Sequence, residues 1–250
     1  MKYSSFCAKD MPNFVDGQVI RSGDCTPSGQ TVVIRPPEYW PNLAFAALMQ
    51  AADIVVLADT LQYSRQSLQN RTRVRNPDGW QWVSVPLKGG QHGRSQAYTR
   101  IRQVPGWRKQ HWKAIAFNYG QSPYFDHYGE TIRALYNREW EYLGALNVAT
   151  TRLVFRWMGF SASLLTAMEL EGHPDSMEAI MAFWPEAELL APAEIPEPCA
   201  ARRLYFSQPD YRQTFVGFAP GMTVLDLIFN YGPDSADILR SGTRIEPIDR

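Results

Sequence analysis

The hydrophobic positions near the start of the chain follow first the period of a strand and then that of a helix. Residues 31–34, Thr-Val-Val-Ile, form a short β-branched run that predicts a buried strand. Residues 41–52 begin with a proline, which is favoured at a helix start, and carry apolar residues on one helical face. The apolar run 54–57 predicts a second strand that is covered on both faces. This order predicts a right-handed βαβ unit with parallel strands.

The rest of the chain changes to a different pattern. Residues 71–87 alternate apolar and polar positions around Asn-Pro-Asp-Gly, which predicts a hairpin. Residues 107–184 are mostly helical in their periodicity. Residues 185–198 are rich in proline and glutamate and are expected to be an irregular connection. The clearest helices are expected at 107–119, 139–158 and 222–230.

These elements indicate an α/β fold. We expect a Rossmann-like βαβ start with a mostly parallel sheet, followed by a helical region. The chain has 250 residues, of which 45% are hydrophobic, enough for one sizeable core. Residues 1–30, rich in Gly, Ser, Pro and Asp, are expected to be an N-terminal extension. Residues 31–250 would form a single domain with a helical C-terminal half.

Charge is distributed unevenly along the chain. The formal net charge is zero, yet residues 64–113 contain eleven Lys or Arg and one acid, Asp78. Such asymmetry indicates a local site for anions. The alternative is that these cations pair with acids elsewhere in the fold. We expect no nucleic acid as a partner, because the net charge is zero and no nucleic-acid-binding motif is present.

The sequence also limits the compartment and the type of site. It has no apolar run of twenty residues and no apolar core of signal-peptide length at its start, so we expect a cytoplasmic protein without a membrane span. Three cysteines, Cys7, Cys25 and Cys199, lack metal-ligand spacing and predict no disulfide framework. No metal site is predicted.

Polar residues cluster around the second predicted strand. Asp53 precedes the strand and Asp59 follows it. Ligands of α/β proteins bind where parallel strands end, so these positions are candidates for a site. Either aspartate could orient an amine or assist a base, although Asp53 could instead be a turn residue. The polar side chains that follow, able to bind a hydroxyl, amide or phosphate, are Gln62, Tyr63, Asn70 and Arg71.

His111 is the histidine best suited to act as a general base. It lies in the basic segment, on the predicted helix 107–119. The near-neutral pKa of a histidine suits removal of a proton from an amine or hydroxyl. The alternative is a helix histidine that makes a structural hydrogen bond. Tryptophans of the same segment could stack on a sugar or base, or belong to the core.

Several short motifs occur in a fixed order. They are Pro37-x-Tyr39-x-Pro41, Leu57-x-Asp59, Gln62-Tyr63-Ser64, Gln69-Asn70-Arg71, Trp107-Arg108-Lys109-x-His111, Asn118-Tyr119 and Asp226-Leu227-x-Phe229-Asn230. Together they resemble the WbqC-like protein family over roughly residues 32–242. The resemblance implies an α/β fold and a context of bacterial surface-polysaccharide or natural-product genes. It does not by itself imply a reaction.

The chain departs from this family at two places. Many relatives carry His-Gln-Pro after the first strand, where this chain has Arg35, Pro36 and Pro37. If that histidine is catalytic in the family, this chain uses another base or performs another reaction. A Ser-Gly-rich stretch of the family is replaced by residues 188–194. The βαβ start is also similar to nucleotidyl and pantoate–amine ligase folds, whose paired histidines are absent here.

Three functions are compatible with these observations. The first is an acyl or aminoacyl transferase that forms an amide on an amine acceptor, an amino sugar or small metabolite. Its donor would be a CoA or phosphopantetheine thioester, with an acyl carrier protein or nucleotide sugar as further partner and no tightly bound cofactor. His111 with Asp59 would deprotonate the amine, and backbone amides near Arg35 would stabilise the oxyanion. The alternatives are an ATP-dependent ligase or nucleotidyltransferase, and a non-catalytic module that binds a nucleotide sugar or carrier protein.

These hypotheses assign three groups of site residues. The catalytic candidates are His111, Asp59 and Asp53. The substrate-binding candidates are Arg35, Tyr39, Gln62, Tyr63, Asn70, Arg71 and Tyr119. The anion-binding candidates are Arg65, Arg73, Arg100 and Arg102.

Overall fold

The structure is a computed structural model that describes residues 29–195, 197 and 199–248. The N-terminal extension predicted for residues 1–30 therefore lies almost wholly outside the described residues, as do Cys7 and Cys25. No helix in the described part of the chain is both long and apolar enough to cross a membrane.

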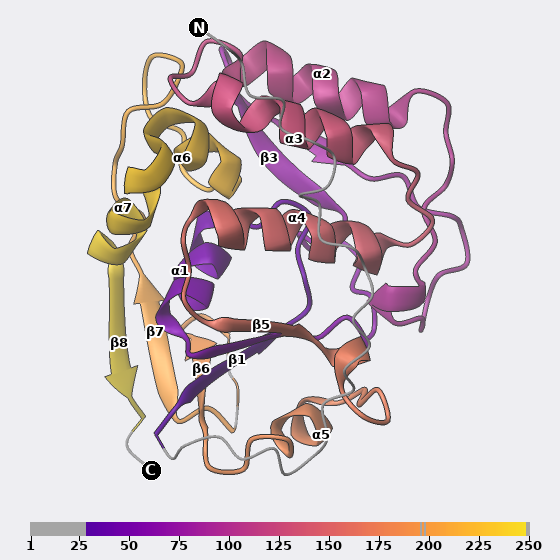
Figure 1. The fold of residues 1–250 in the computed structure, drawn as a ribbon, viewed down its shortest axis with the longest axis vertical. Helices are drawn as coiled ribbons and strands as arrows, with labels where there is room; N and C mark the ends of the chain where they lie inside the picture. The colour runs from indigo at the N-terminus through magenta and orange to yellow at the C-terminus, as the bar shows by residue number, and fades with distance from the viewer. Residues whose placement is uncertain (1–28, 196, 198, 249–250) are drawn as a thin grey trace, which may run out of the picture.

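The predicted βαβ unit is confirmed. It consists of β1 (Thr31–Arg35), α1 (Leu43–Ala51) and β2 (Ile54–Leu57), and β1 pairs with β2 in parallel (Figure 1). The helix begins two residues later than predicted. The reason is the side chain of Asn42, which caps α1 by accepting a hydrogen bond from the backbone N–H of Phe45 at 2.7 Å.

The main sheet has six strands in the order β5-β2-β1-β6-β7-β8. The first five are parallel to their neighbours, and β8 is antiparallel to β7. The four strands that the sequence pattern missed are β5 (Ser163–Thr166), β6 (Glu188–Pro192), β7 (Arg202–Phe206) and β8 (Thr243–Pro247). The prediction that residues 107–184 are mostly helical is confirmed, with β5 as an exception, whereas the prediction of an irregular connection at 185–198 was wrong at β6. Both strands are short. Pro185 precedes β6 and Pro192 is its last residue, and because proline is uncommon in strands, the apolar residues between them do not stand out as a strand.

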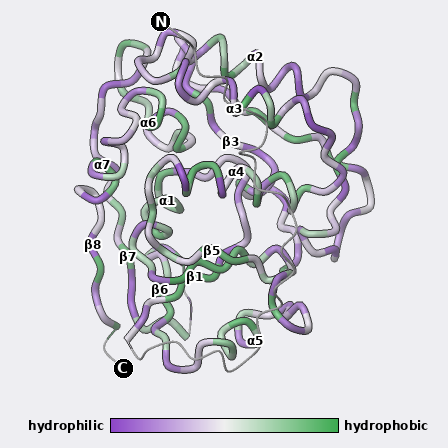
Figure 2. The backbone as a smooth tube through the Cα atoms, viewed as in Figure 1, coloured by the Kyte–Doolittle hydropathy of each residue, from purple (hydrophilic) through white to green (hydrophobic). Residues whose placement is uncertain are grey.

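Helices cover both faces of this sheet. In Figure 1, α1 and α4 (Leu143–Trp157) lie over one face, and α5 (Met177–Met181) lies over the other. Neighbouring residues of β1 and β2 point to opposite sides, as a pleated strand requires. Val33, Val55 and Leu57 belong to the larger core, whereas Val32 and Ile34 belong to the smaller core on the α5 side. Figure 2 shows the apolar residues concentrated along these strands.

A second layer lies beyond α4. It contains α2 (Trp107–Tyr119), α3 (Phe125–Asn137) and the predicted hairpin, whose strands are β3 (Arg71–Asn76) and β4 (Gly79–Ser84) (Figure 1). Of the C-terminal helices, α7 (Ser235–Ser241) packs against α1, and α6 (Val224–Tyr231) packs against α3, α4 and α7. Short 3-10 turns complete the described elements, at η2 (Gln96–Tyr98), η3 (Ala167–Glu169) and η4 (Gly232–Asp234).

Helix α4 begins later than the sequence predicted. The amphipathic pattern starts at Glu139, but the helix starts at Leu143. The backbone N–H of Ile101 donates to the carbonyl of Glu141, and that of Leu143 donates to the carbonyl of Thr99, both at 2.8 Å. These long-range bonds keep the preceding residues extended, so the tertiary context overrides the local pattern.

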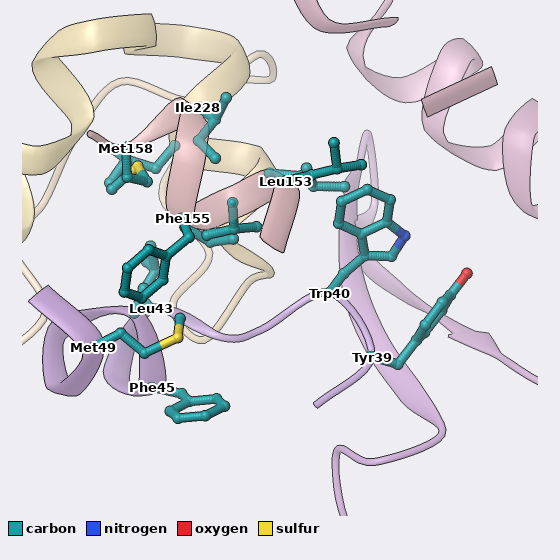
Figure 3. Packing of buried hydrophobic residues seen from close by; sticks show 14 of the residues in the cluster. Tyr39, Trp40, Leu43, Phe45, Met49, Leu153, Phe155, Met158 and Ile228 are labelled. Carbon is teal, nitrogen blue, oxygen red and sulfur yellow. The ribbon is translucent and has the colours of Figure 1, made fainter. Parts of the chain in front are cut away.

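The segment between β1 and α1 is buried, which is unusual for a loop. Tyr39 and Trp40 are at most 1% exposed, and Figure 3 shows Trp40 beside Leu153 of α4. The carbonyl of Pro37 accepts hydrogen bonds from the side chains of Gln96 (2.7 Å) and Asn147 (3.1 Å). The carbonyl of Trp40 accepts from the hydroxyls of Thr72 and Thr223, both at 3.1 Å. This segment therefore joins the sheet to the second layer.

The order of the strands also fixes where a ligand site is expected. From β1 the chain moves outward through β2 to β5, and then returns to β6 on the other side of β1. The carboxyl ends of these parallel strands, at Arg35, Leu57, Thr166 and Pro192, share one edge of the sheet. In α/β proteins ligands bind at this edge.

We predict that Gly144→Ala destabilises the protein. A Cβ at this position of α4 would lie 2.8 Å from the Cα of Ala97 and 3.1 Å from the carbonyl oxygen of Gln96. Both atoms are backbone, so one chain has to move. We expect the free energy of unfolding to fall by about 1–3 kcal/mol in urea denaturation.

Gly89→Ala is the matched control for this prediction. A Cβ at Gly89 meets nothing within 4 Å, and its φ is not in the left-handed region. The stability of this variant should stay the same or rise slightly, because alanine restricts the unfolded chain. Equal stability of the two variants would contradict the close approach of α4 to η2.

Candidate functional site

A pocket lies at the carboxyl edge of the sheet, beside the end of β2. Its volume is about 430 Å³. The residues between 91 and 99 form one wall, because the backbone N–H groups of Gln96 and Ala97 donate to the carbonyls of Leu61 (3.0 Å) and Asp59 (2.7 Å). The loop that follows β5 forms the opposite wall. The lining residues are Thr60, Gln62, Gly93, Ser95, Tyr98, Met168, His173 and Asp175.

Asp59 lies directly behind this pocket and is 5% exposed. Its Oδ1 accepts a hydrogen bond from the backbone N–H of Met168 at 3.2 Å. Burial, with a smaller contribution from the nearby charge of Glu169, raises the pKa of Asp59 to about 6 against the lowering effect of the backbone N–H groups. The carboxyl group therefore changes its charge close to neutral pH.

His173 forms part of the pocket wall in an uncommon conformation. Its φ is +48°, in the left-handed region, which costs a residue with a side chain about 1 kcal/mol. Two hydrogen bonds hold the segment: the N–H of His173 donates to the carbonyl of Leu170 (3.1 Å), and the hydroxyl of Thr60 donates to the carbonyl of Pro174 (2.5 Å). Backbone strain that the surroundings enforce is typical of functional sites.

His173 and Asp175 carry no local sequence signal that marks them as site residues. Both residues lie in the loop after β5, and β5 was not recognised as a strand. Had it been recognised, this loop would have been expected at the carboxyl edge, next to the residues that follow β2. The pocket residues His173 and Asp175 could therefore have been found only by first identifying β5 as a strand.

His111 lies in a different environment, within a closed hydrogen-bond network. Its Nε2 is 3.1 Å from the carbonyl oxygen of Ser84, which can only accept, so Nε2 carries the proton. Its Nδ1 therefore accepts from the hydroxyl of Tyr39 at 2.8 Å. Tyr136 in turn donates to the oxygen of Tyr39 and accepts from the indole N–H of Trp40 at 2.8 Å. Every polar hydrogen in this series of hydrogen bonds already has an acceptor.

Burial determines the charge of His111. The side chain is 7% exposed, and desolvation lowers its pKa to about 4, against a small raising effect of the bond to Ser84. The imidazole is therefore neutral at pH 7 and uses both nitrogens internally. No hydrogen bond between His111 and Asp59 is present among the described residues, and these two side chains have separate partners. This arrangement matches the structural alternative for His111.

Asp53 lies at the opposite end of the sheet from the pocket. Its Oδ2 accepts hydrogen bonds from the backbone N–H (2.8 Å) and the hydroxyl (2.9 Å) of Thr31. These bonds join the amino ends of β1 and β2. The whole length of β2 separates Asp53 from Asp59, so the structure does not bring the two aspartates together.

The region around Arg35 offers few backbone donors. Pro36 and Pro37 have no N–H group, and the N–H of Tyr39 already donates to the carbonyl of Leu68 at 3.0 Å. Arg35 is half-buried, and its Nε has no acceptor within the described part of the chain. Its charge lowers the pKa of buried Glu38 against the larger raising effect of desolvation. The prediction that several amides of this loop stabilise an oxyanion therefore lacks the necessary N–H groups.

The other substrate-binding candidates divide into buried and surface residues. Tyr39 and Tyr119 are fully buried, and Tyr119 accepts a hydrogen bond from the N–H of Arg75 at 2.9 Å. Asn70 donates to the carbonyl of Val85 at 3.2 Å, so its side chain supports the hairpin. Tyr63 is half-buried, and burial raises the pKa of its hydroxyl against the smaller lowering effects of the charges of Arg65 and Arg71. Gln62 alone of the seven candidates lines the pocket at the carboxyl edge.

The anion-binding candidates are spread over several surfaces. Arg73 stacks on the hairpin, with its guanidinium 4.5 Å from the ring centre of Trp80 and 5.0 Å from that of Trp82. Arg71 stacks on Trp82 at 4.5 Å. Arg100 pairs with Glu141 at 3.6 Å. Arg65 and Arg102 are exposed, so the four candidates do not converge on one site. No cluster of metal-ligating side chains occurs in the described ranges.

We predict that the stabilising effect of His111 depends on pH. Its folded-state pKa of about 4 lies below the ordinary value of 6.5, so its contribution is complete above pH 6.5 and is lost as the pH falls toward 4. The difference in unfolding free energy between the wild type and His111→Gln should shrink by about 3 kcal/mol between pH 7.5 and pH 4.

Subtraction at each pH isolates His111, because the other titrating groups are present in both proteins. His92→Gln is the control, since His92 is exposed on the loop before η2. Its difference from the wild type should stay flat across the same range. A flat difference for His111→Gln as well would show that His111 is not held neutral by burial.

Comparison with known proteins gives two matches. The model of the WbqC-like protein family matches residues 36–189 and 200–238. The uncharacterized protein Rv1507c of Mycobacterium tuberculosis (strain ATCC 25618 / H37Rv) is 26% identical over 226 residues, which cover 84% of this chain and 97% of that protein. No solved structure matches. Since the family model covers most of the sequence, the chain belongs to the WbqC-like protein family.

Proposed function

We propose that this WbqC-like protein transfers an acyl or aminoacyl group from a thioester donor to the amine of a small acceptor. The reaction would occur in the pocket at the carboxyl edge of the sheet. The observation that carries this proposal is His173 at the pocket wall, whose backbone is held in the left-handed region by the bond of its N–H to Leu170 and by the bond of Thr60 to the adjacent Pro174. A thioester is already activated, so positioning and one base suffice.

His173 would act as the general base. Asp175 also lines the pocket, and its carboxylate would attract the ammonium form of the acceptor. After loss of one proton to solvent, the amine nitrogen attacks the thioester carbonyl carbon and transfers its second proton to His173. The C–S bond then breaks, the thiolate takes the proton from His173, and an amide and a free thiol are the products.

Gln62 would stabilise the oxyanion of this reaction. Its exposed side-chain amide lines the same pocket and has no hydrogen-bond partner among the described residues. The N–H of a side-chain amide is a known donor to such oxyanions. This role replaces the backbone amides near Arg35, where the two prolines remove N–H groups.

The donor would reach the pocket along the basic segment. Tyr63 follows Gln62 in the chain and lies within electrostatic range of Arg65 and Arg71. Arg71 and Arg73 then continue this line onto the hairpin. CoA and carrier-bound phosphopantetheine both carry phosphates, which arginines bind well. An acyl carrier protein and a nucleotide-sugar acceptor remain the partners we propose, in the cytoplasm.

We predict that His173→Gly abolishes turnover without unfolding the protein. Glycine adopts positive φ freely, so relief of strain should offset the greater entropy of the unfolded chain, and the melting temperature should stay close to that of the wild type. Loss of a general base should lower the rate of thiol release from an acyl-CoA at least about 100-fold. His127→Ala is the matched control, because His127 is exposed on α3 and does not line this pocket, and this variant should keep full activity.

Three measurements separate this function from its alternatives. Thiol release that depends on an amine, with a panel of amino sugars and small amines, supports transfer. AMP or pyrophosphate release that needs ATP and Mg²⁺ would support a ligase. A thermal shift with CoA, carrier or nucleotide sugars but no turnover would support a binding module. Wild-type activity in His173→Gly would exclude His173 as the base.

A further inference from the structure

A second pocket is lined by residues from the start of α2 and the end of α3. These two helices lie side by side in the second layer (Figure 1). Its volume is about 660 Å³, within the range of small-molecule sites. Its wall includes Trp107, Arg108, Lys109, Lys113, Arg133 and Tyr136. It shares no lining residue with the pocket at the carboxyl edge.

The start of α2 supplies backbone donors to this pocket. The residue before the helix is Gly106, which has a φ of +79° and provides no side-chain cap. A helix has no internal acceptors for the N–H groups of its first turn, so those of Arg108 and Lys109 are available. The helix dipole adds partial positive charge at the same place, and the helix has thirteen residues.

A buried side chain provides an independent indication of a ligand. Trp107 is 4% exposed and lines the pocket, yet its indole Nε1–H has no acceptor among the residues that the structure describes. The ring packs edge-on against His111 at 5.0 Å between centroids. A buried donor without an acceptor costs about 1–3 kcal/mol, so an acceptor atom from a ligand would be favourable here.

The charged side chains of the wall also favour an anion. Arg108 and Arg133 have acid neighbours, Glu139 at 3.6 Å and Glu130 at 3.3 Å. Lys109 and Lys113 make no ion pair with any described residue. They lie on the same helix, four residues apart, so they face the same side.

We infer that this pocket binds a phosphorylated small molecule. The phosphate would accept hydrogen bonds from the first-turn N–H groups of α2 and from the indole of Trp107, and Lys109 and Lys113 would balance its charge. The remaining volume accommodates an organic group beside Trp112. This inference does not depend on the transferase proposal, because the two pockets are separate.

Titration of the full chain with inorganic phosphate, pyrophosphate and AMP tests this inference. Calorimetry gives the dissociation constants, and the indole Nε1–H signal of Trp107 in ¹⁵N spectra reports the site. The variant Trp107→Phe identifies that signal by its absence. We expect this signal to shift on saturation, and an organic phosphate to bind more tightly than inorganic phosphate.

Two surface variants decide the location. Lys109→Gln combined with Lys113→Gln should weaken binding at least about tenfold, since two charge-assisted contacts are lost. Lys88→Gln, an exposed lysine of the same basic segment that does not line the pocket, should bind as the wild type does. Absence of binding at millimolar ligand, an unmoved Trp107 signal, or equal affinity in both variants would each overturn the inference.

Discussion

The fold depends on the burial of the segment between β1 and α1. Backbone groups removed from water need partners, and a loop cannot supply them from its own ladder. Here side chains from distant elements supply them: Gln96 and Asn147 to Pro37, and Thr72 and Thr223 to Trp40. Trp40 has a φ of +47°, a conformation that its carbonyl bonds and its buried indole hold in place. Sheet, hairpin, α4 and α6 are thus coordinated through one short stretch of chain.

The same constraint explains the state of His111. Burying Tyr39 and Trp40 also buries their polar atoms, and the network through Tyr136 to His111 provides their partners. A network in which each donor has an acceptor stabilises one arrangement and resists the addition of a proton. His111 is therefore well placed to hold the second layer against the segment, and poorly placed to accept a proton from a substrate. A base is better sought where side chains are exposed, as His173 is at the carboxyl edge.

Local pattern predicted the elements whose signals are local. The βαβ start, the hairpin and the helix at 107–119 each carry a period or turn sequence of their own. β5 and β6 have four and five residues and depend on neighbours that are distant in sequence, so no local signal identified them. For the site, Asp59 was placed correctly at the carboxyl edge by its position after β2. Asp53 could have been assigned to the opposite end by the same reasoning. The closed network of His111 could not be read from spacing, because Tyr39, Ser84 and Tyr136 are far from it in the chain.

The basic segment shows how folding divides a charge that looks continuous in sequence. Arg75 is 3% exposed and donates to Gln213 at 3.0 Å, while Gln213 donates to the buried carboxylate of Asp226 at 2.9 Å. This arginine is therefore linked to an acid of α6 only through an intermediate amide and is not available to a ligand, whereas Arg100 pairs directly with Glu141, as the alternative predicted. Its neighbours Arg71 and Arg73 stack on the tryptophans of the hairpin. Lys109 and Lys113, both on α2, line the pocket at the start of that helix. One charged stretch thus provides a structural cation and two separate basic surfaces. Because these surfaces differ in geometry, a flat stacked face and a concave helix terminus, they should select different anions even though they arise from the same fifty residues.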